Sequence, residues 1–183
     1  MNRIIFLDID GVLNAYDSFK YMPAPDMPEI LYVGIDDDKL QHLKHIVDVT
    51  GAEIYLTSSW KQHWEKQDKE KQDVFANEID NRFAAVGLKV TDKTYDTAGK
   101  YRAAGIHKVL TERHPEAWVI LDDEIYTDFP DYAEEIFPHL VQTLWYGYGL
   151  NARKAEAAIR VLNGELMTDN DATYVSLFHH GKE

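Results

Sequence analysis

The chain contains a short apolar run, Ile4 to Leu7, that is followed at once by two aspartates, Asp8 and Asp10. An apolar run of this length is typical of a buried β-strand. Residues i and i+2 of an extended chain point to the same side, so the two carboxylates would face one small volume. Gly11 lets the backbone turn away directly afterwards. Crowded carboxylates repel one another unless a cation neutralises them, so the pattern predicts a site for a hard metal ion such as Mg²⁺.

The chain's 183 residues suit a single domain, 1–183, and 45% of them are hydrophobic, which is enough to form a core. It contains no cysteine and no segment that resembles a signal peptide, which favours a cytoplasmic protein. The run Ile4 to Leu7 is far too short to span a membrane. The net charge of −13 repels phosphate backbones, which argues against non-specific nucleic-acid binding but leaves room for one phosphate end.

Apolar runs that favour strands alternate with stretches of helical periodicity, which predicts an α/β fold with a mainly parallel sheet. We expect strands over 3–7, 52–56, 89–90, 118–121 and 139–143, and helices over 36–50, about 100–113 and 151–162. Prolines at 23, 25 and 28 favour a loop or an irregular hairpin over 15–33, and spaced aromatic residues over 61–95 favour one or two surface helices. Residues 164–183 are expected to be peripheral, with an edge strand over 174–178.

Polar side chains stand at the ends of three expected strands. Beside the pair Asp8 and Asp10, the strand over 52–56 ends in Thr57 and Ser58, and the strand over 118–121 ends in Asp122 and Asp123. Ligands of open α/β sheets bind outside the carboxyl ends of the strands, so these groups are expected to converge. A cation near the start of the helix over 100–113 would complete a Mg²⁺-dependent phosphoryl-transfer site.

The chain resembles the haloacid dehalogenase (HAD) superfamily of Mg²⁺-dependent phosphohydrolases. The segment Asp8-Ile9-Asp10-Gly11-Val12 matches the first motif of that superfamily, Leu56-Thr57 the second, and Leu121-Asp122-Asp123 the fourth. Lys100 and Arg102 both stand where the cation of the third motif is expected, and Arg102-Ala103-Ala104-Gly105-Ile106 resembles an Arg-Gly-x-x-Ile pattern of small members, which favours Arg102. The resemblance implies a Rossmann-like three-layer α/β/α sandwich over about 3–163.

The resemblance also implies roles for these residues. Asp8 would be the nucleophile that forms an aspartyl-phosphate, and Asp10 the general acid and base. Gly11, Thr57 and Ser58, together with Arg102 or Lys100, would contact the phosphate. Asp122 and Asp123 would bind Mg²⁺ together with Asp8 and the backbone carbonyl of Asp10. An aspartate at position 10 favours phosphatases and mutases over the ATPases and dehalogenases of the superfamily.

The intervals in which such enzymes carry cap domains are short here. They leave a flap near 15–33 and a helical addition near 61–95, so we expect a minimal cap and an open site. Open sites accept phosphate on bulky substrates, and the segments Asp-Gly-Val-Leu-Asn and Leu-Asp-Asp resemble the phosphatase modules of polynucleotide repair proteins. A phosphoprotein, a polynucleotide end and a small phosphorylated metabolite remain alternatives.

Two further alternatives stay open. Trp60 and Trp64 are spaced to form an aromatic platform for a base, but packing in the core is the commoner role for such a pair. A protein that keeps the fold for binding or regulation without turnover is the alternative from another class, although every catalytic residue type is present. The oligomeric state is not encoded in any pattern we identify.

Overall fold

The computed structural model describes residues 2–18, 21–23, 31–95 and 101–168. Lys100 and the strand expected over 174–178 lie outside the described residues. Among the described helices, each is too short or too polar to cross a membrane.

A parallel sheet forms the centre of the fold. Its strands are β1 (Arg3–Leu7), β4 (Glu53–Leu56), β5 (Val90–Lys93), β6 (Ala117–Asp122) and β7 (Leu140–Gln142). They lie in the order β5-β4-β1-β6-β7, and every neighbouring pair is parallel. The predicted α/β class with a mainly parallel sheet is therefore confirmed. From β1 the chain builds outward to β4 and β5 and then returns to β6 on the other side, so the order reverses beside β1.

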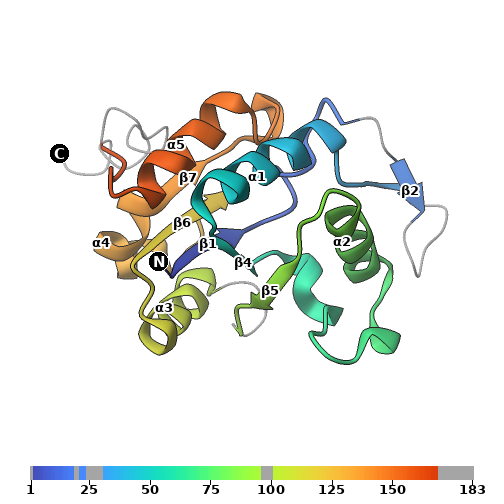
Figure 1. The fold of residues 1–183 in the computed structure, drawn as a ribbon, viewed down its shortest axis with the longest axis horizontal. Coiled ribbons are helices and arrows are strands. Elements are labelled where there is room, and N and C mark those ends of the chain that lie inside the picture. Colours follow the sequence, from blue (N-terminus) through green and yellow to red (C-terminus); the bar gives the residue numbers. More distant parts are fainter. Residues whose placement is uncertain (1, 19–20, 24–30, 96–100, 169–183) are drawn as a thin grey trace.

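Helices cover both faces of this sheet, which makes three layers (Figure 1). The alternation of β1 separates the two cores, because successive side chains of a strand point to opposite faces. Ile5 and Leu7 pack with the face covered by α1 (Asp37–Thr50), α2 (Val74–Ala85) and α5 (Ala152–Leu162). Ile4 and Phe6 pack with the face covered by α3 (Arg102–Arg113) and α4 (Ala133–Ile136). Short 3₁₀ helices η3 (Phe129–Tyr132), η4 (Phe137–His139) and η5 (Trp145–Gly147) flank β7.

Helix α1 begins and ends as its sequence predicts. The Asp36 side chain accepts hydrogen bonds from the backbone N–H groups of Asp38 and Lys39, and so caps the helix. At the other end, Gly51 takes a left-handed conformation with φ 66° and donates its N–H to the carbonyl of Val47. These two caps place the apolar stripe of α1 against the sheet.

The segment after β4 contains one of the one or two helices expected over 61–95, and the rest of it is less regular. It forms two 3₁₀ turns, η1 (Ser59–His63) and η2 (Lys69–Lys71), and only α2 is an α-helix. Residues 65–73 contain no apolar side chain, so a helix there would bury nothing that could stabilise it. The spacing of Trp60 and Trp64 suits an α-helix, but Trp60 lies in the 3₁₀ turn η1 and Trp64 directly follows it, and both side chains are buried.

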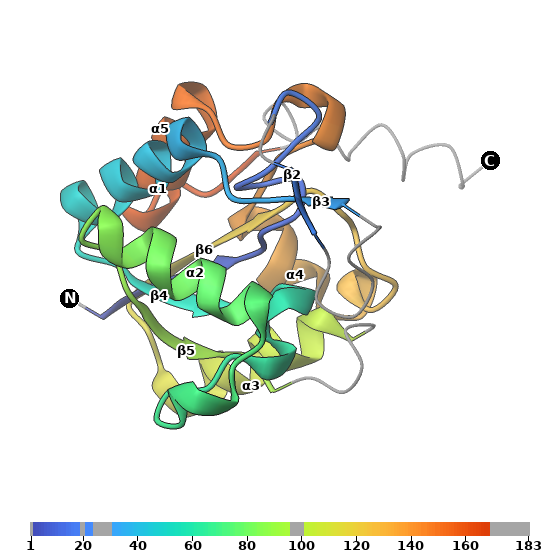
Figure 2. The same cartoon turned by 90° about the vertical axis from the view of Figure 1, so that its right-hand side faces the viewer.

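Between β1 and α1 the chain forms a small antiparallel pair, β2 (Tyr21–Pro23) and β3 (Leu31–Val33). Figure 2 shows this hairpin separate from the central sheet. The prediction of an irregular hairpin is confirmed for its two described strands. Pro23 is the last residue of β2. Proline would break the interior of a helix, which is consistent with extended chain here.

Candidate active site

The backbone ladder of the sheet continues just past the strand ends and fixes the first residue after each strand. The N–H of Asp8 donates to the carbonyl of Leu121 at 2.9 Å, and the N–H of Thr57 donates to that of Leu7 at 2.8 Å. The carbonyl of Asp122 accepts from the N–H of Thr143 at 2.9 Å. Asp8 and Asp122 are thus placed side by side at the point where the strand order reverses, which is where open α/β sheets bind ligands.

Three carboxylates meet at this point. Asp8, Asp122 and Asp123 each offer an oxygen that lies within 4.8 Å of the others. Asp8 is 4% exposed and Asp122 is fully buried. Three acids in so little space are costly without a positive partner. The cluster therefore provides the hard oxygen ligands that a divalent cation such as Mg²⁺ prefers.

The arginine at the start of α3 is the cation nearest to this cluster among the described residues. Nη1 of Arg102 lies 3.2 Å from Oδ2 of Asp8 and also contacts Oδ2 of Asp122. Its guanidinium lies over the ring of Tyr126, 4.0 Å from the centroid. Burial disfavours the charged form of Arg102, but Asp8 and Asp122 outweigh this and raise its pKa. Arg102 is therefore a fixed positive charge at the carboxylates.

Two carboxyl groups of the cluster, those of Asp122 and Asp123, tend to hold protons when no metal is bound. Burial, together with repulsion from Asp8, raises the pKa of Asp122 even though Arg102 contacts it. Burial and the neighbouring acids likewise raise the pKa of Asp123 to about 7. Because metal ligands must be deprotonated, protons and a cation would compete for the cluster.

Asp10 stands apart from the three clustered carboxylates. Its Oδ1 accepts from Nδ2 of Asn14 at 2.9 Å, and its Oδ2 accepts from Nε1 of Trp60 at 2.9 Å. Desolvation in the cleft and the charge of Asp8 raise the pKa of Asp10, whereas the two hydrogen bonds lower it. The net shift is upward, which favours a carboxyl that can hold a proton and release it.

Gly11 allows the chain to turn between the two groups of acids. Its φ is 71°, and a Cβ atom at this position would lie 2.1 Å from the Cγ and Oδ2 atoms of Asp123. Its carbonyl accepts a hydrogen bond of 2.7 Å from the hydroxyl of Thr143. Only glycine fits here without displacing the Asp123 carboxylate.

The two hydroxyl residues after β4 differ in their surroundings. Oγ1 of Thr57 is buried and has no hydrogen-bond partner among the described residues. The hydroxyl oxygen of Ser58 accepts from the backbone N–H of Trp60 and so caps η1. A buried hydroxyl without a partner is unusual, and a bound phosphate oxygen would satisfy Thr57.

Several side chains at the site were not identified from the sequence. Tyr126 covers Arg102, Asn14 binds Asp10, and Thr143 binds Gly11. Trp60, which was expected in the core or in a platform for a base, is buried, and its bond to Asp10 was not foreseen. The contact of Asn14 could have been suspected from the sequence, because Asn14 is close to Gly11 in the chain and its side chain accepts a hydrogen bond from the N–H of Gly11. Asparagine side chains often bond to nearby backbone groups in turns. The other contacts join residues far apart in the chain, so no local pattern could reveal them.

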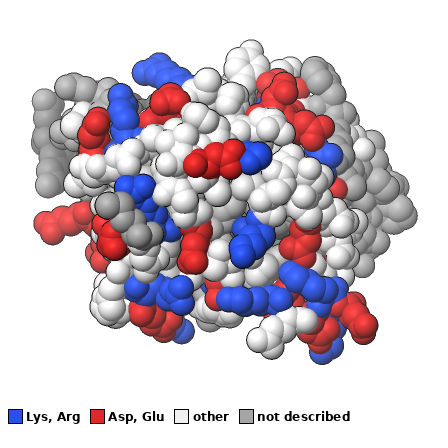
Figure 3. All heavy atoms as spheres, viewed as in Figure 1, with Lys and Arg blue, Asp and Glu red and all other residues white. Residues whose placement is uncertain are grey.

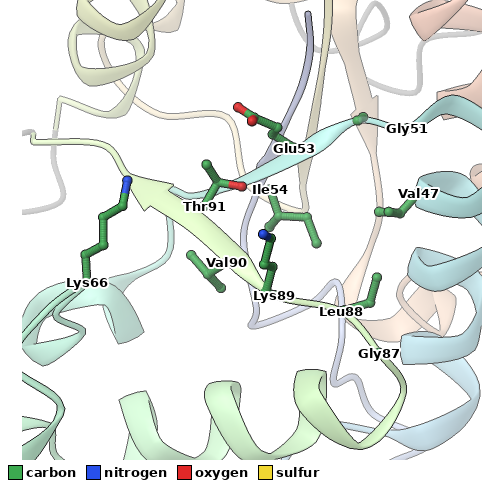
Figure 4. A pocket seen from close by; sticks show the side chains of 11 residues that line it. Val47, Gly51, Glu53, Ile54, Lys66, Gly87, Leu88, Lys89, Val90 and Thr91 are labelled. Carbon is green, nitrogen blue, oxygen red and sulfur yellow. The ribbon is translucent and has the colours of Figure 1, made fainter.

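The acids line an open cleft of about 580 Å³. Its lining consists of Asp8, Asp10, Ser59, Arg102, Asp123, Glu124, Tyr126, Trp145 and Tyr146. A larger hollow of about 730 Å³ lies beside β4 and β5, and its charged lining is Glu53, Lys66 and Lys89 (Figure 4). The convergence of carboxylates and a buried arginine, not volume, identifies the smaller cleft as the candidate active site.

The comparisons with known proteins agree with this geometry. The family described as the HAD domain in Swiss Army Knife RNA repair proteins matches residues 4–155, which run from the second residue of β1 past β7 and include the residues that line the cleft. No curated protein and no solved structure gives a significant match. HAD domains typically use Mg²⁺, and membership suggests a hydrolase of the phosphatase type. The chain belongs to the HAD domain family of the Swiss Army Knife RNA repair proteins.

Proposed function

We propose that this protein is a Mg²⁺-dependent phosphomonoesterase that acts through an aspartyl-phosphate on Asp8. The observation that carries the proposal is that Asp8 and Asp10 lie in different surroundings. Asp8 belongs to the cluster with Asp122 and Asp123 beside Arg102, whereas Asp10 is held outside it by Asn14 and Trp60. One carboxylate thus lies beside Arg102 and the proposed metal ligands, and the other is placed to carry a proton.

The residues present fit a magnesium ion. Oxygens of Asp8, Asp122 and Asp123 lie within 4.8 Å of one another and are the hard ligands that Mg²⁺ prefers, so these three residues would hold the ion. The carbonyl of Asp10 is our proposed fourth protein ligand. When bound, the ion would neutralise charge on the phosphoryl oxygens and on the carboxylates.

In the first step, an Oδ atom of Asp8 attacks phosphorus, and the bond from phosphorus to the ester oxygen breaks. The leaving oxygen takes the proton held by Asp10, so that an alcohol departs. In the second step, water attacks phosphorus while its proton passes to Asp10, and the bond to Asp8 breaks to release phosphate. Each step uses Asp10 once, first as acid and then as base.

The phosphoryl oxygens would be held by groups that now lack partners. Oγ1 of Thr57 and Nε of Arg102 are both buried without a hydrogen-bond acceptor or donor among the described residues. A phosphoryl group in the cleft could accept hydrogen bonds from both. The charge of Arg102 would stabilise the negative charge on the phosphoryl oxygens in the transition state. We include Ser58 and Gly11 as further contacts, and Lys100 as the alternative to Arg102.

A phosphate at a polynucleotide end is the second, finer candidate for the substrate. The occurrence of this domain family in RNA repair proteins favours it. The net charge of −13 argues against long contacts with a phosphate backbone. On the face seen in Figure 3, basic side chains stand among acidic ones, and several basic ones lie in a row near the lower edge. The net charge therefore favours a terminal phosphate over an internal stretch of backbone as the bound group.

The test is a phosphatase panel with and without Mg²⁺, covering nucleotides, sugar phosphates, phosphopeptides and oligoribonucleotides with a 3′-phosphate. We expect Mg²⁺-dependent release of phosphate by the wild type and its loss in Asp8→Asn. Asp48→Asn is the matched control, because Asp48 is exposed on α1 and pairs with Lys44. A folded wild-type protein that releases phosphate from no member of the panel would refute the proposal, as would an Asp8→Asn variant with undiminished activity.

A further inference from the structure

A group of exposed aromatic rings stands at the rim of the catalytic cleft. Trp145 and Tyr146, in η5, line the same cleft as Asp8 and Arg102. Tyr146 is 77% exposed, and Tyr16, which is 64% exposed, lies with its ring centroid 5.4 Å away. Large aromatic side chains that gather in the open beside a polar cleft mark a contact surface more often than a packing need.

These rings are held by a rigid pair of backbone segments. The N–H of Tyr16 donates to the carbonyl of Trp145 at 3.1 Å, and the N–H of Leu150 donates to the carbonyl of Val12 at 2.8 Å. Gly149 has φ 60°, and a Cβ there would lie 2.7 Å from the carbonyl oxygen of Val12. The segment that carries Tyr146 is therefore tied to the segment that directly follows Asp10, which holds the backbone that carries the rings close to the acids and lowers the entropic cost of binding.

The charges in the cleft limit what can lie against the rings. Asp8, Asp10, Asp123 and Glu124 line it, and Arg102 is the cation in the same lining. Arg102 is already engaged with carboxylates. One phosphate can be accommodated there with a metal ion, but a second phosphate beside Glu124 would be repelled. The group next to the reacting phosphate is therefore expected to be neutral and, against aromatic rings, planar.

We propose that Tyr146 and Tyr16, together with Trp145, form an aromatic platform that stacks the base of a nucleoside whose phosphomonoester occupies the cleft. The inference rests on the proposed function and gives it a substrate class. A stacked base accounts for the exposed rings, for their fixed position and for the lack of added positive charge in the cleft lining. Stacking on an aromatic ring suits any base, so the platform selects nucleosides over other alcohols without reading sequence.

The test compares the kcat/KM for adenosine 3′- and 5′-monophosphate, for an oligoadenylate with a 3′-phosphate, and for glycerol phosphate. Tyr146→Ala should lower the ratio of nucleotide to glycerol phosphate about 5- to 150-fold, the range for loss of one stacked base. Tyr146→Phe keeps the ring and should keep the ratio within about twofold. Tyr95→Ala is the control, because Tyr95 is equally open at 63% exposure but follows β5 at the opposite edge of the sheet.

A fall with the oligonucleotide alone would assign the platform to RNA ends, and a fall with both kinds of substrate would assign it to any nucleoside phosphate. An unchanged ratio, or an equal loss on glycerol phosphate, would overturn the inference. A calorimetric measurement separates the proposed phosphatase activity from the proposed platform. It compares the binding of adenosine monophosphate and of ribose 5-phosphate to the wild type and to Tyr146→Ala. If no phosphate ester is hydrolysed, the proposed function fails, whereas tighter binding of the nucleotide that is lost in Tyr146→Ala would still support the platform. Equal binding of both ligands would remove it.

Discussion

Replacing Trp60 with phenylalanine would remove one hydrogen bond from the proposed acid and base while keeping an aromatic ring. Nε1 of Trp60 donates to Oδ2 of Asp10 at 2.9 Å, and among the described residues the other side-chain donor to this carboxylate is Asn14, which donates to Oδ1. The ring itself packs on Tyr32 and Phe75, with centroids 5.5 and 4.9 Å away, and phenylalanine can retain much of that packing. The variant therefore isolates the hydrogen bond.

The expected loss follows from the nature of this bond. A hydrogen bond to a charged group contributes about 1.5–3 kcal/mol. If most of that energy holds Asp10 in its productive orientation, kcat falls about 10- to 100-fold, since about 1.4 kcal/mol corresponds to a factor of ten. General acid and base catalysis supplies about 10²- to 10⁴-fold in total, so the loss stays within what Asp10 can provide.

Trp64→Phe is the matched control. Nε1 of Trp64 also donates to a carboxylate oxygen, Oδ1 of Asp80 at 2.9 Å, and its ring is equally buried, but Asp80 does not line the cleft. Steady-state kcat on a common substrate and thermal unfolding would be measured for both variants. We expect similar losses of stability and a fall of kcat in Trp60→Phe alone. Equal kcat values in the two variants would refute the assignment of Asp10 as a positioned acid and base.

Two further predictions concern the carboxylate cluster. Gly11→Ala should weaken Mg²⁺ binding, measured by calorimetric titration, because the added Cβ would displace Asp123. Gly51→Ala is the control, since Gly51 has a similar φ of 66° but no atom within 4 Å of an added Cβ, and it should leave the Mg²⁺ affinity intact. Burial raises the pKa of Asp123 to about 7, so its contribution to stability without metal is present at low pH and is lost as the pH rises through that value. Mg²⁺ should therefore raise Tm more at about pH 8 than at about pH 6, and an equal rise at both would contradict the competition with protons.

The regular parts of the fold were predictable from local pattern. The apolar run of β1 lies between two cores, so its four residues Ile4 to Leu7 are all buried, and the sequence shows this as a continuous run. Helix α1 begins after Asp36 and ends at Gly51 because both caps are local interactions. Residues 59–73 could not be predicted in the same way, because their 3₁₀ turns depend on the tertiary packing of Trp60 and Trp64 and not on a local pattern.

The candidate site was predictable in its residue types but not in its contacts. The positions of Asp8 and Asp122 follow from strand ends, and parallel pairing of β1 with β6 then brings them together. The contact of Trp60 with Asp10 spans 50 residues, and that of Thr143 with Gly11 spans 132. Such contacts depend on the order of strands and the path of loops, which single-residue spacing does not encode.

The central claim is that Asp8 becomes covalently phosphorylated during turnover. The direct measurement is an acid quench of the enzyme in the steady state with Mg²⁺ and its best substrate, followed by borohydride reduction and peptide mass spectrometry. We expect the peptide that contains Asp8 to carry the homoserine that marks a reduced acyl-phosphate, and the same peptide from Asp8→Asn to lack it. Steady turnover with no modification of Asp8, or with modification of another carboxylate instead, would contradict the account.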